Sequence, residues 1–468
     1  MLTLDAVAYA LLQASVTPAV PRIQRTLDAS ATATAWVITA FLLTAAIATP
    51  VAGRLGDLYG KQRVLAATLA LMVFGTLLAA LSHSLALLVA ARAIQGVGGG
   101  VFPLAFGIVA EALPARRVSS GIGFVSAMLG VGTTIGIVVS GPIVAAFGYE
   151  GLFWVALGPL AAAAVATAVL IAPSPATARG GGLGPPALAA AVLCAALGAV
   201  MLAITQAPHQ GWLSAPTLGL AAAGAIGLAA WTAVELRART PLVDMRMLRE
   251  RAVWTTNVAG LLLAVGMFCA FILIPQLAVG HLGLSQSAAG LLLVPTAGMM
   301  LVSGIAMGAL ERTIGLKASM VLGAALSVLA FALLAVAHRT PTQVAGAALV
   351  AGLGIGISFA AMPSLIVAVV APGQTGVATG MNTVTRWIGG AFGSQVAASI
   401  LAASGSSDAG FTTAFAATAG ALVLATVATL AIPTAAPAAP GRDARPHAHG
   451  VHGPAAVARA DARGGGRR

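Results

Sequence analysis

The sequence predicts an all-α polytopic membrane protein, and three observations support that prediction. Of the 468 residues, 59% are hydrophobic and only 8% are charged, whereas a soluble protein carries charge on roughly a quarter of its residues. The apolar residues fall in blocks of about 20, the length that a helix needs to cross a bilayer. The charged residues collect in the short segments between these blocks, as they do in the loops of membrane proteins.

Fourteen apolar runs follow one another along the chain, and each predicts one membrane-spanning helix. The runs cover residues 4–21, 34–53, 64–82, 86–109, 120–145, 151–172, 186–206, 214–235, 254–278, 288–310, 317–337, 343–369, 378–402 and 410–432. The first run lacks the positive amino-terminal region of a signal peptide, so we interpret it as the first span. It begins so close to Met1 that the natural chain can start further upstream.

The distribution of Lys and Arg predicts the orientation in the membrane. An even number of spans places both termini on one side. If that side is the cytoplasm, the inner loops and tail hold 19 of the 24 cations and the outer loops hold three, while Arg92 and Arg386 lie within spans. Cations concentrate in cytoplasmic loops. We therefore expect a multi-pass protein of the cell (inner or plasma) membrane with both termini in the cytoplasm.

Several function classes are excluded by the sequence. The net charge of +12 does not indicate nucleic-acid binding, because the cations lie in membrane loops. The ATPase, metalloprotease and serine-hydrolase motifs are missing, so we expect neither an enzyme nor a cofactor. Cys194 and Cys269 lie in apolar runs and are read as packing residues. No metal site is predicted, because His447, His449 and His452 lack an acidic or Cys partner at ligand spacing.

Two segments are predicted to lie outside the membrane, and one motif repeats. Residues 235–251 form the longest charged loop, which we interpret as a solvated cytoplasmic connector. The tail from residue 433 is rich in Ala, Pro, Gly and Arg and is expected to be disordered. The pattern of Gly53, Leu55 and Gly60 returns as Gly308, Leu310 and Gly315 at a second hairpin, a repeat of the kind from which many transporters are built.

The most informative string is Gly53–Arg63, a charged hairpin between the second and third apolar runs. It resembles the loop signature of the major facilitator superfamily, Gly-x-Leu-Ala/Gly-Asp-Arg-x-Gly-Arg-Lys, with Leu58 in place of the usual cation. In the fourth run, Leu88–Gly98 resembles a second signature of that family, with Arg92, Gln95 and two glycines at matching positions.

Two weaker similarities point to the drug:proton antiporters of this superfamily. Gly132–Pro142 resembles the antiporter motif of the fifth span, but Ile137 and Ser140 stand where Pro and Gly are usual. Asn382–Ala391 is similar to a segment of the eleventh core span in the fourteen-span group, the EmrB/QacA type. Together the similarities cover nearly the whole chain apart from its tail.

The resemblance implies a major facilitator fold with fourteen transmembrane helices. Residues 1–172 would form an N-terminal six-helix bundle, and residues 254–432 a C-terminal one. Residues 173–253 would supply two linker transmembrane helices and a cytoplasmic loop, and residues 433–468 the cytoplasmic tail. The resemblance also implies alternating access and export of drugs or metabolites against proton entry.

The same resemblance assigns roles to particular residues. The residues of the cytoplasmic gate would be Gly53, Asp57, Gly60, Lys61 and Arg63. The partner of Asp57 would lie near the start of the eleventh core span, within residues 376–380.

Proton coupling is the least defined part of the sequence prediction. Arg92 and Gln95 are expected in the coupling pathway by resemblance. The fourteen-span exporters commonly carry an Asp in the first span, where this chain has Gln13, which cannot titrate. Of the twelve acids, Asp5 is the one placed convincingly within a span, and carboxylates in spans are the usual proton carriers. Either Asp5 substitutes, or coupling takes another route.

Two further groups of residues are candidates for the interior. Scattered polar residues would line a mostly apolar substrate cavity, suited to lipophilic, cationic or neutral compounds: Gln13, Asn257, Gln276, Asn382 and Arg386. Small residues and a proline would shape helix packing and kinks: Gly132, Gly136, Gly141 and Pro142.

The expected function is therefore export of a lipophilic small molecule by proton antiport. The expected partners are that substrate, protons and the lipid bilayer, with no nucleic acid, and the chain is expected to act as a monomer. Two alternatives remain at this stage. One is a nutrient importer of the same superfamily, and the other is a membrane receptor or scaffold that transports nothing.

Overall fold

The computed structural model describes residues 1–433 except residues 30, 173–186, 239–240, 242, 372–373 and 405–406. The predictions for the tail, including its three histidines, lie outside the described residues. Regular structure in the described part of the chain is helical throughout, in agreement with the predicted fold class.

The elements of the N-terminal half are α1 (Leu2–Ser15), the 3-10 turn η1 (Thr17–Ala19), α2 (Val20–Thr26), α3 (Ala31–Tyr59), α4 (Lys61–Ala80), α5 (Leu85–Gly96), the 3-10 turn η2 (Val97–Gly100), α6 (Val101–Ala112), α7 (Ala115–Phe147) and α8 (Glu150–Leu170). Two long helices follow, α9 (Ala187–Gln210) and α10 (Ala215–Arg237). The short helix α11 (Met245–Arg249) then leads to the C-terminal half: α12 (Arg251–Gly280), α13 (Gln286–Leu291), α14 (Val294–Val336), α15 (Pro341–Val369), α16 (Thr375–Ala403) and α17 (Asp408–Leu430).

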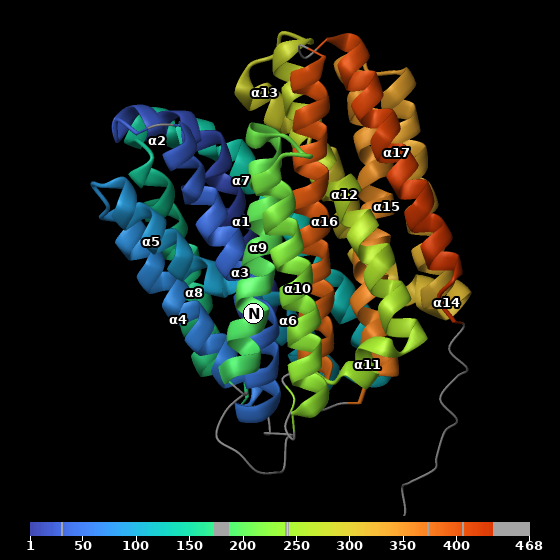
Figure 1. The fold of residues 1–468 in the computed structure, drawn as a ribbon. Helices are drawn as coiled ribbons and strands as arrows, with labels where there is room; N and C mark the ends of the chain where they lie inside the picture. Colours follow the sequence, from blue (N-terminus) through green and yellow to red (C-terminus); the bar gives the residue numbers. More distant parts are fainter. Residues whose placement is uncertain are drawn as a thin grey trace, which may run out of the picture. The chain divides into compact units, whose positions relative to one another are not determined.

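The two halves meet through a small number of helix pairs. Figure 1 shows α1–α8 on one side, α12–α17 on the other, and α9 and α10 in front of their junction. The contacts across the junction run mainly from α3 to α16 and from α7 to α14 and α15. Helix α9 packs on α10 and also touches α3 and α16, so it contacts both halves.

The outward faces of the helices are apolar, as a bilayer requires. Phe74 on α4, Val169 on α8, Ile226 on α10 and Leu424 on α17 are each more than half exposed. Large apolar side chains would be costly on such a surface in water, whereas lipid is as apolar as they are. Backbone polar groups are satisfied within the helices, which is what allows such segments to span a membrane.

By length and composition, eleven helices of the described residues qualify as membrane spans, against fourteen predicted apolar runs. Runs 288–310 and 317–337 fall within one candidate, Ala288–Val336, because α14 continues through them. The first run is divided at Val16 into α1, η1 and α2, where Pro18 and Pro21 favour helix starts. Helix α16 is long enough but is not among the eleven, since glycines, threonines and Arg386 lower its hydropathy.

The two halves share a glycine break at equivalent hairpins. Gly60, between α3 and α4, has φ +98°, and Gly315, inside α14, has φ +80° and ψ +163°. Positive φ values are strained for any residue with a Cβ atom. The repeated pattern in the sequence thus corresponds to two chain breaks that need glycine.

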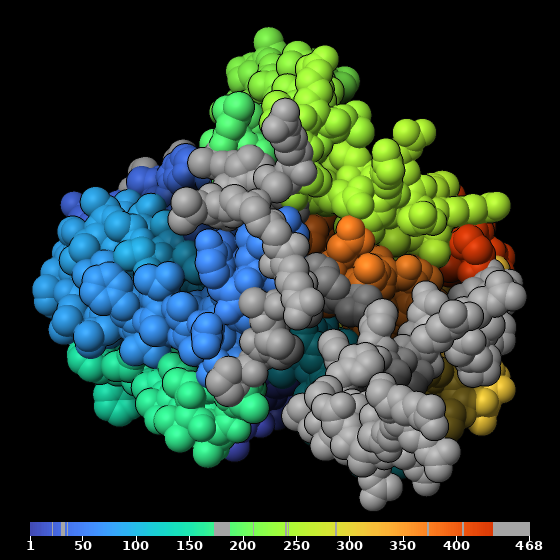
Figure 2. All heavy atoms as spheres, turned by 90° about the horizontal axis from the view of Figure 1, so that it is seen from below, coloured from blue at the N-terminus to red at the C-terminus, as the bar shows by residue number. Residues whose placement is uncertain are grey.

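Figure 2 views the bundle from below, at the end that carries the 53–63 string, which we call the hairpin end. The segment 235–251 lies here, and the prediction of a plain solvated loop is wrong for it. It contains α11, and Val243, Met245 and Met247 are buried. They pack in one cluster with Trp231 of α10 and Val377 of α16, because apolar side chains gain by leaving water.

Candidate functional site

At the hairpin end, a buried carboxylate of one half contacts the start of a helix of the other half. Asp57 is 0% exposed, and its carboxylate accepts hydrogen bonds from the backbone amides of Gly376 (3.4 Å) and Val377 (3.2 Å). The first N–H groups of a helix have no partners within the helix, and the helix dipole favours negative charge there. Gln374, the N-cap residue of α16, makes no side-chain cap bond. Asp57 therefore caps α16 from a distance of about 320 residues along the chain.

Lys61 balances the charge of Asp57 and links it to α6. Its Nζ atom lies 3.0 Å from Asp57 Oδ1 and forms a short ion pair with Glu111. The Lys61 stem occupies the space that a Cβ atom on Gly107 would need. Loss of Lys61 would leave the buried Asp57 carboxylate without its counter-ion, which costs about 3–5 kcal/mol. Arg63, grouped with the gate by its sequence, is exposed and lies outside this network.

The contact between Asp57 and α16 depends on two glycines that let α3 and α16 touch backbone to backbone. A Cβ atom added at Gly53 would collide with the Gly376 carbonyl. One added at Gly376 would lie 2.6 Å from the Gly53 carbonyl oxygen and 2.9 Å from Asp57 Oδ1. Cβ atoms essentially never approach other heavy atoms within 3.0 Å, so a side chain at either position would push the helices apart. Close approach of the two helices is what brings Asp57 within reach of the α16 amides.

The connector contributes a contact that the sequence reasoning missed. Asp244 Oδ1 accepts from the Arg246 amide and so caps α11, while Gln374 Nε2 donates to Asp244 Oδ2 over 3.1 Å. The available signal was an Asp directly before a short run of helix formers. The start of α16 is thereby contacted from two sides, by Asp57 and by Asp244 at the start of α11.

Arg92 lies inside the N-terminal half and is 1% exposed. Its Nε donates to the Val37 carbonyl (3.1 Å), a terminal nitrogen donates to Gln95 Oε1 (2.7 Å), and its guanidinium lies 4.2 Å from the centre of the Phe41 ring. Gln95 in turn donates to Thr76. An arginine at mid-membrane costs about 2.5–3.5 kcal/mol on insertion scales, and these neutral acceptors and the ring offset part of it.

Asp5 is buried near the start of α1, and its side-chain hydrogen bond in the described part of the chain is to α8. Its Oδ2 accepts from the Thr167 hydroxyl of α8 over 2.8 Å, and its Oδ1 has no partner among the described residues. The Thr167 carbonyl accepts from Gln62 Nε2 (3.1 Å), and Gln62 is next to Lys61 in the chain. Thr167 and Gln62 thus link Asp5 to the hairpin.

The predicted cavity residues divide into three places. Asn382 of α16 donates to Asn257 of α12 over 3.0 Å, and Arg386 lies one turn further along α16. Gln13 belongs to α1 in the other half, and its Oε1 is buried without a partner among the described residues. Gln276 lines a cavity of about 410 Å³, described next.

That cavity lies between the halves, toward the end opposite the hairpin. It is lined mainly by apolar parts of α7 and α12, including Ile137, Gly141 and Pro275, and by Pro18 beyond α1. The halves enclose a cavity here, with α13 touching α7 beside it, while at the hairpin end they are in contact through α3 and α16.

The glycine motif of α7 packs against α1 over part of its length. A Cβ atom at Gly132 would lie 2.7 Å from the Val7 carbonyl oxygen, and one at Gly136 would lie 2.7 Å from the Leu11 carbonyl oxygen. Gly141 differs from the packing role predicted for it, because nothing lies within 4 Å of its added Cβ. It borders the open cavity instead. Pro142 follows within the same helix.

Comparison with known proteins agrees with this geometry. The sequence pattern of the Major Facilitator Superfamily matches residues 3–394 and 256–459. The chain belongs to the major facilitator superfamily. It is thus a multi-pass membrane transporter of small molecules and not an enzyme.

Members of the superfamily with similar sequences carry multidrug names. The chain is 27% identical over 375 residues to the Multidrug resistance protein B homolog of Mycobacterium tuberculosis, covering 78% of this chain and 69% of that one. It is 26% identical over 370 residues to the Multidrug transporter protein MdtP of Bacillus subtilis, covering 76% and 66%. The chain therefore spans about two thirds of the length of these relatives.

A solved structure shows the same fold. The human organic anion transporter MFSD10 (TETRAN) superimposes with a TM-score of 0.67 over 92% of this chain and 96% of that one, at 18% sequence identity. At 18% identity, this similarity shows that the two proteins share a fold.

Proposed function

We propose that the chain exports drugs or lipophilic metabolites across the cell membrane in exchange for protons, by alternating access. The observation that carries the proposal is the Asp57 carboxylate on the Gly376 and Val377 amides. Hydrogen bonds to a charged group contribute about 1.5–3 kcal/mol each. A contact of that size can hold one end of the transporter closed and still break in each cycle.

The proposal assigns the hairpin end to the cytoplasm. The distribution of Lys and Arg, 19 of 24 on that side in the predicted topology, supports this assignment and the proposal that both termini lie there. The structure then represents a conformation that is closed to the cytoplasm, with the 410 Å³ cavity toward the outside. In this scheme residues 1–172 and 254–432 rock against one another as two bundles, with α9 and α10 as linker helices between them.

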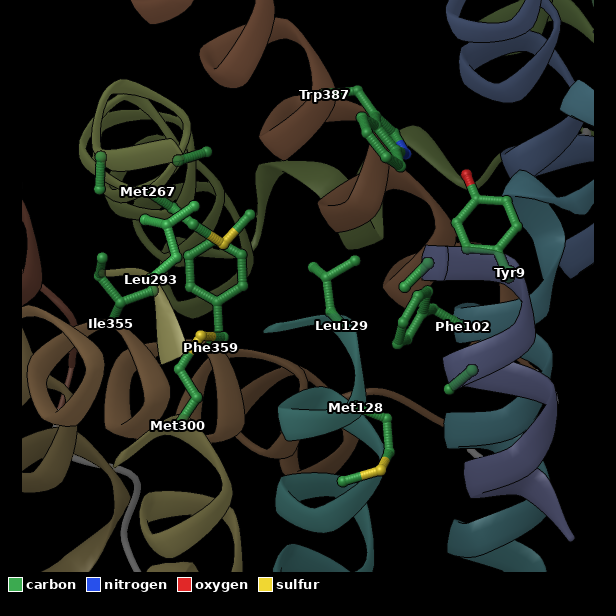
Figure 3. Packing of buried hydrophobic residues seen from close by; sticks show 14 of the residues in the cluster. Tyr9, Phe102, Met128, Leu129, Met267, Leu293, Met300, Ile355, Phe359 and Trp387 are labelled. Carbon is green, nitrogen blue, oxygen red and sulfur yellow. The ribbon is translucent and has the colours of Figure 1, made fainter. Parts of the chain in front are cut away.

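Two observations support a lipophilic small-molecule substrate. Two similar proteins are named as multidrug resistance or transport proteins. The interface between the halves is lined largely by apolar and aromatic side chains, some of them shown in Figure 3, which suits binding of such compounds. We propose that Gln13, Asn257, Gln276 and Asn382 supply the polar contacts, and that the chain acts as a monomer.

Proton coupling is proposed to involve Asp5. Buried carboxyl groups in membrane spans are the usual proton carriers, and Asp5 is buried, with one oxygen lacking a partner among the described residues. Its link through Thr167 to Gln62 gives a path by which protonation can reach the hairpin. We propose that Arg92 and Gln95 contribute to coupling by holding α5 against α3 and α4.

The test is Asp57→Asn in the full chain. An asparagine keeps the size of the side chain, but its NH₂ group would face either an α16 amide or Lys61, so the closed end is destabilised. We expect efflux of a fluorescent lipophilic dye from expressing cells to fall at least ~10-fold, the equivalent of about 1.4 kcal/mol, with the amount of protein in the membrane unchanged.

The matched control is Arg116→Gln, which removes an exposed charge at the same end and should leave efflux unchanged. Wild-type efflux by Asp57→Asn would contradict the proposed gate. Expressing cells that show no efflux, with the wild-type protein in the membrane, would contradict the export function itself.

A further inference from the structure

We propose that Arg386, Trp387 and Tyr9 bind the anionic group of an organic substrate at the junction of the two halves. This inference rests on the proposed transport function and specifies its cargo as amphipathic organic anions, with a carboxylate or sulfonate on an aromatic body. It departs from the cationic or neutral compounds that the sequence suggests.

Arg386 is a buried cation without a counter-charge. It is 6% exposed, its Nη2 donates to Thr383 Oγ1 (3.1 Å), and its Nε–H has no partner among the described residues. None of the ion pairs in the described part of the chain includes it. A guanidinium remains protonated in proteins, and an ionised residue within a span marks a substrate or ion pathway.

The buried acids of the described residues are engaged elsewhere. Asp5 contacts Thr167, and Asp57 contacts α16 and Lys61. Glu235 accepts from the Trp231 indole and the Val243 amide. None of the described acids therefore supplies a negative charge to Arg386, which leaves this role to a ligand.

Arg92 is a buried arginine whose N–H groups do have hydrogen-bond partners within the protein. It bonds to a backbone carbonyl and to Gln95, and it lies over Phe41. Two acceptors and a ring within its own half use its donors. Arg386 has one hydroxyl and the Phe359 ring, 5.0 Å from the ring centre, so part of its donor capacity is left for a ligand.

Two more buried donors, one on the residue that follows Arg386 and one on α1, also lack partners among the described residues. The Trp387 Nε1–H and the Tyr9 hydroxyl are buried without a hydrogen bond in the described residues. Figure 3 shows these two groups pointing toward one another from α16 and α1. Buried donors are almost always satisfied. Two N–H groups and one O–H group suit the oxygens of an anion, which would be held between helices of opposite halves.

The surroundings favour an organic anion over an inorganic one. Phe359 lies against Arg386, and Phe268 packs edge-on to Trp387 with ring centres 5.9 Å apart. Met362 lies beside Gly260 and Asn382 on the same side. Aromatic rings and a thioether bind an apolar body, whereas they offer nothing to chloride or phosphate.

The test compares two probes that differ by one charged group. 1-Anilinonaphthalene-8-sulfonate and N-phenyl-1-naphthylamine share a scaffold, and only the first carries a sulfonate. We expect the purified full chain in lipid nanodiscs to bind the sulfonate at least ~10-fold more tightly, as for a charge-assisted contact, after subtraction of empty nanodiscs. Arg386→Gln should remove this preference and leave binding of the neutral amine unchanged.

Further variants keep the outcome interpretable. Arg386→Lys keeps the charge and should retain part of the preference. Trp387→Phe keeps the ring, loses one donor and should weaken sulfonate binding alone, which supplies the test if Arg386→Gln does not fold. Arg339→Gln, an exposed arginine with 83% of its side chain accessible, is the control and should behave as wild type.

Several results would overturn the inference. They are equal binding of both probes by wild type, no binding of the sulfonate, tighter binding of the cation ethidium, and displacement of the sulfonate by an equimolar amount of chloride. If one of these is found while Asp57-dependent dye efflux persists, the substrate class fails and the exporter stands. If sulfonate preference is found without any efflux, the site stands and the exporter fails.

Discussion

At the scale of single residues, the proposed gate depends as much on a missing side chain as on a charged one. Asp57 can reach the α16 amides only because Gly53 and Gly376 let the two helix backbones touch. Lys61, the first residue of α4, then neutralises the Asp57 carboxylate. A charge and a glycine are therefore two parts of one contact, and each can be tested separately.

Gly53→Ala is predicted to impair transport without touching any charge. The added Cβ would collide with the Gly376 carbonyl, so α3 and α16 must separate and Asp57 loses its contact. We expect dye efflux to fall toward the level of Asp57→Asn, with normal amounts of protein in the membrane, measured in the same cells.

The matched control is Gly158→Ala on the exposed side of α8, where nothing lies within 4 Å of the new Cβ. This substitution should leave efflux near the wild-type rate. Wild-type transport by Gly53→Ala would mean that the closed gate does not require backbone contact between the helices.

At the scale of elements, α14 shows how one glycine divides a helix. Its 43 residues are continuous apart from Gly315, whose φ and ψ values fall in a region that is essentially restricted to glycine. Gly60 makes the corresponding break between α3 and α4. The hairpins of both halves thus depend on backbone conformation and not on a long polar loop.

Gly315→Ala is predicted to lower stability. A non-glycine residue in this conformation costs about 1–3 kcal/mol, and no neighbour lies within 4 Å to add a packing gain. We expect a lower melting temperature for the purified protein in detergent, measured by intrinsic fluorescence.

Gly346→Ala provides the comparison, since Gly346 is exposed on α15 with helical geometry and open space around it. Alanine should be neutral there or stabilise by up to about 1 kcal/mol. Equal melting temperatures for both variants would show that the break at Gly315 carries no strain.

At the scale of the whole molecule, the sequence predicts helices and the charged hairpin well, because both are local. Hydropathy identifies the apolar runs, and the 53–63 string marks one end of the bundle. It cannot reveal pairs such as Asp5 with Thr167 or Tyr9 facing Trp387, which are far apart in the chain and meet only after packing. Helix α11 was missed for the same reason, since Met245 becomes buried only against other elements.

The last prediction concerns coupling between Asp5 and the gate across the molecule. Asn at position 5 keeps the size of the side chain and can still accept from Thr167, but it cannot bind and release a proton. Asp5→Asn should therefore abolish substrate uptake driven by a pH gradient in inverted vesicles, while exchange of labelled for unlabelled substrate without a gradient continues. Thr167→Ser retains the hydroxyl and should resemble wild type in both assays. Gradient-driven uptake by Asp5→Asn at the wild-type rate would remove Asp5 from the mechanism and assign coupling to another group.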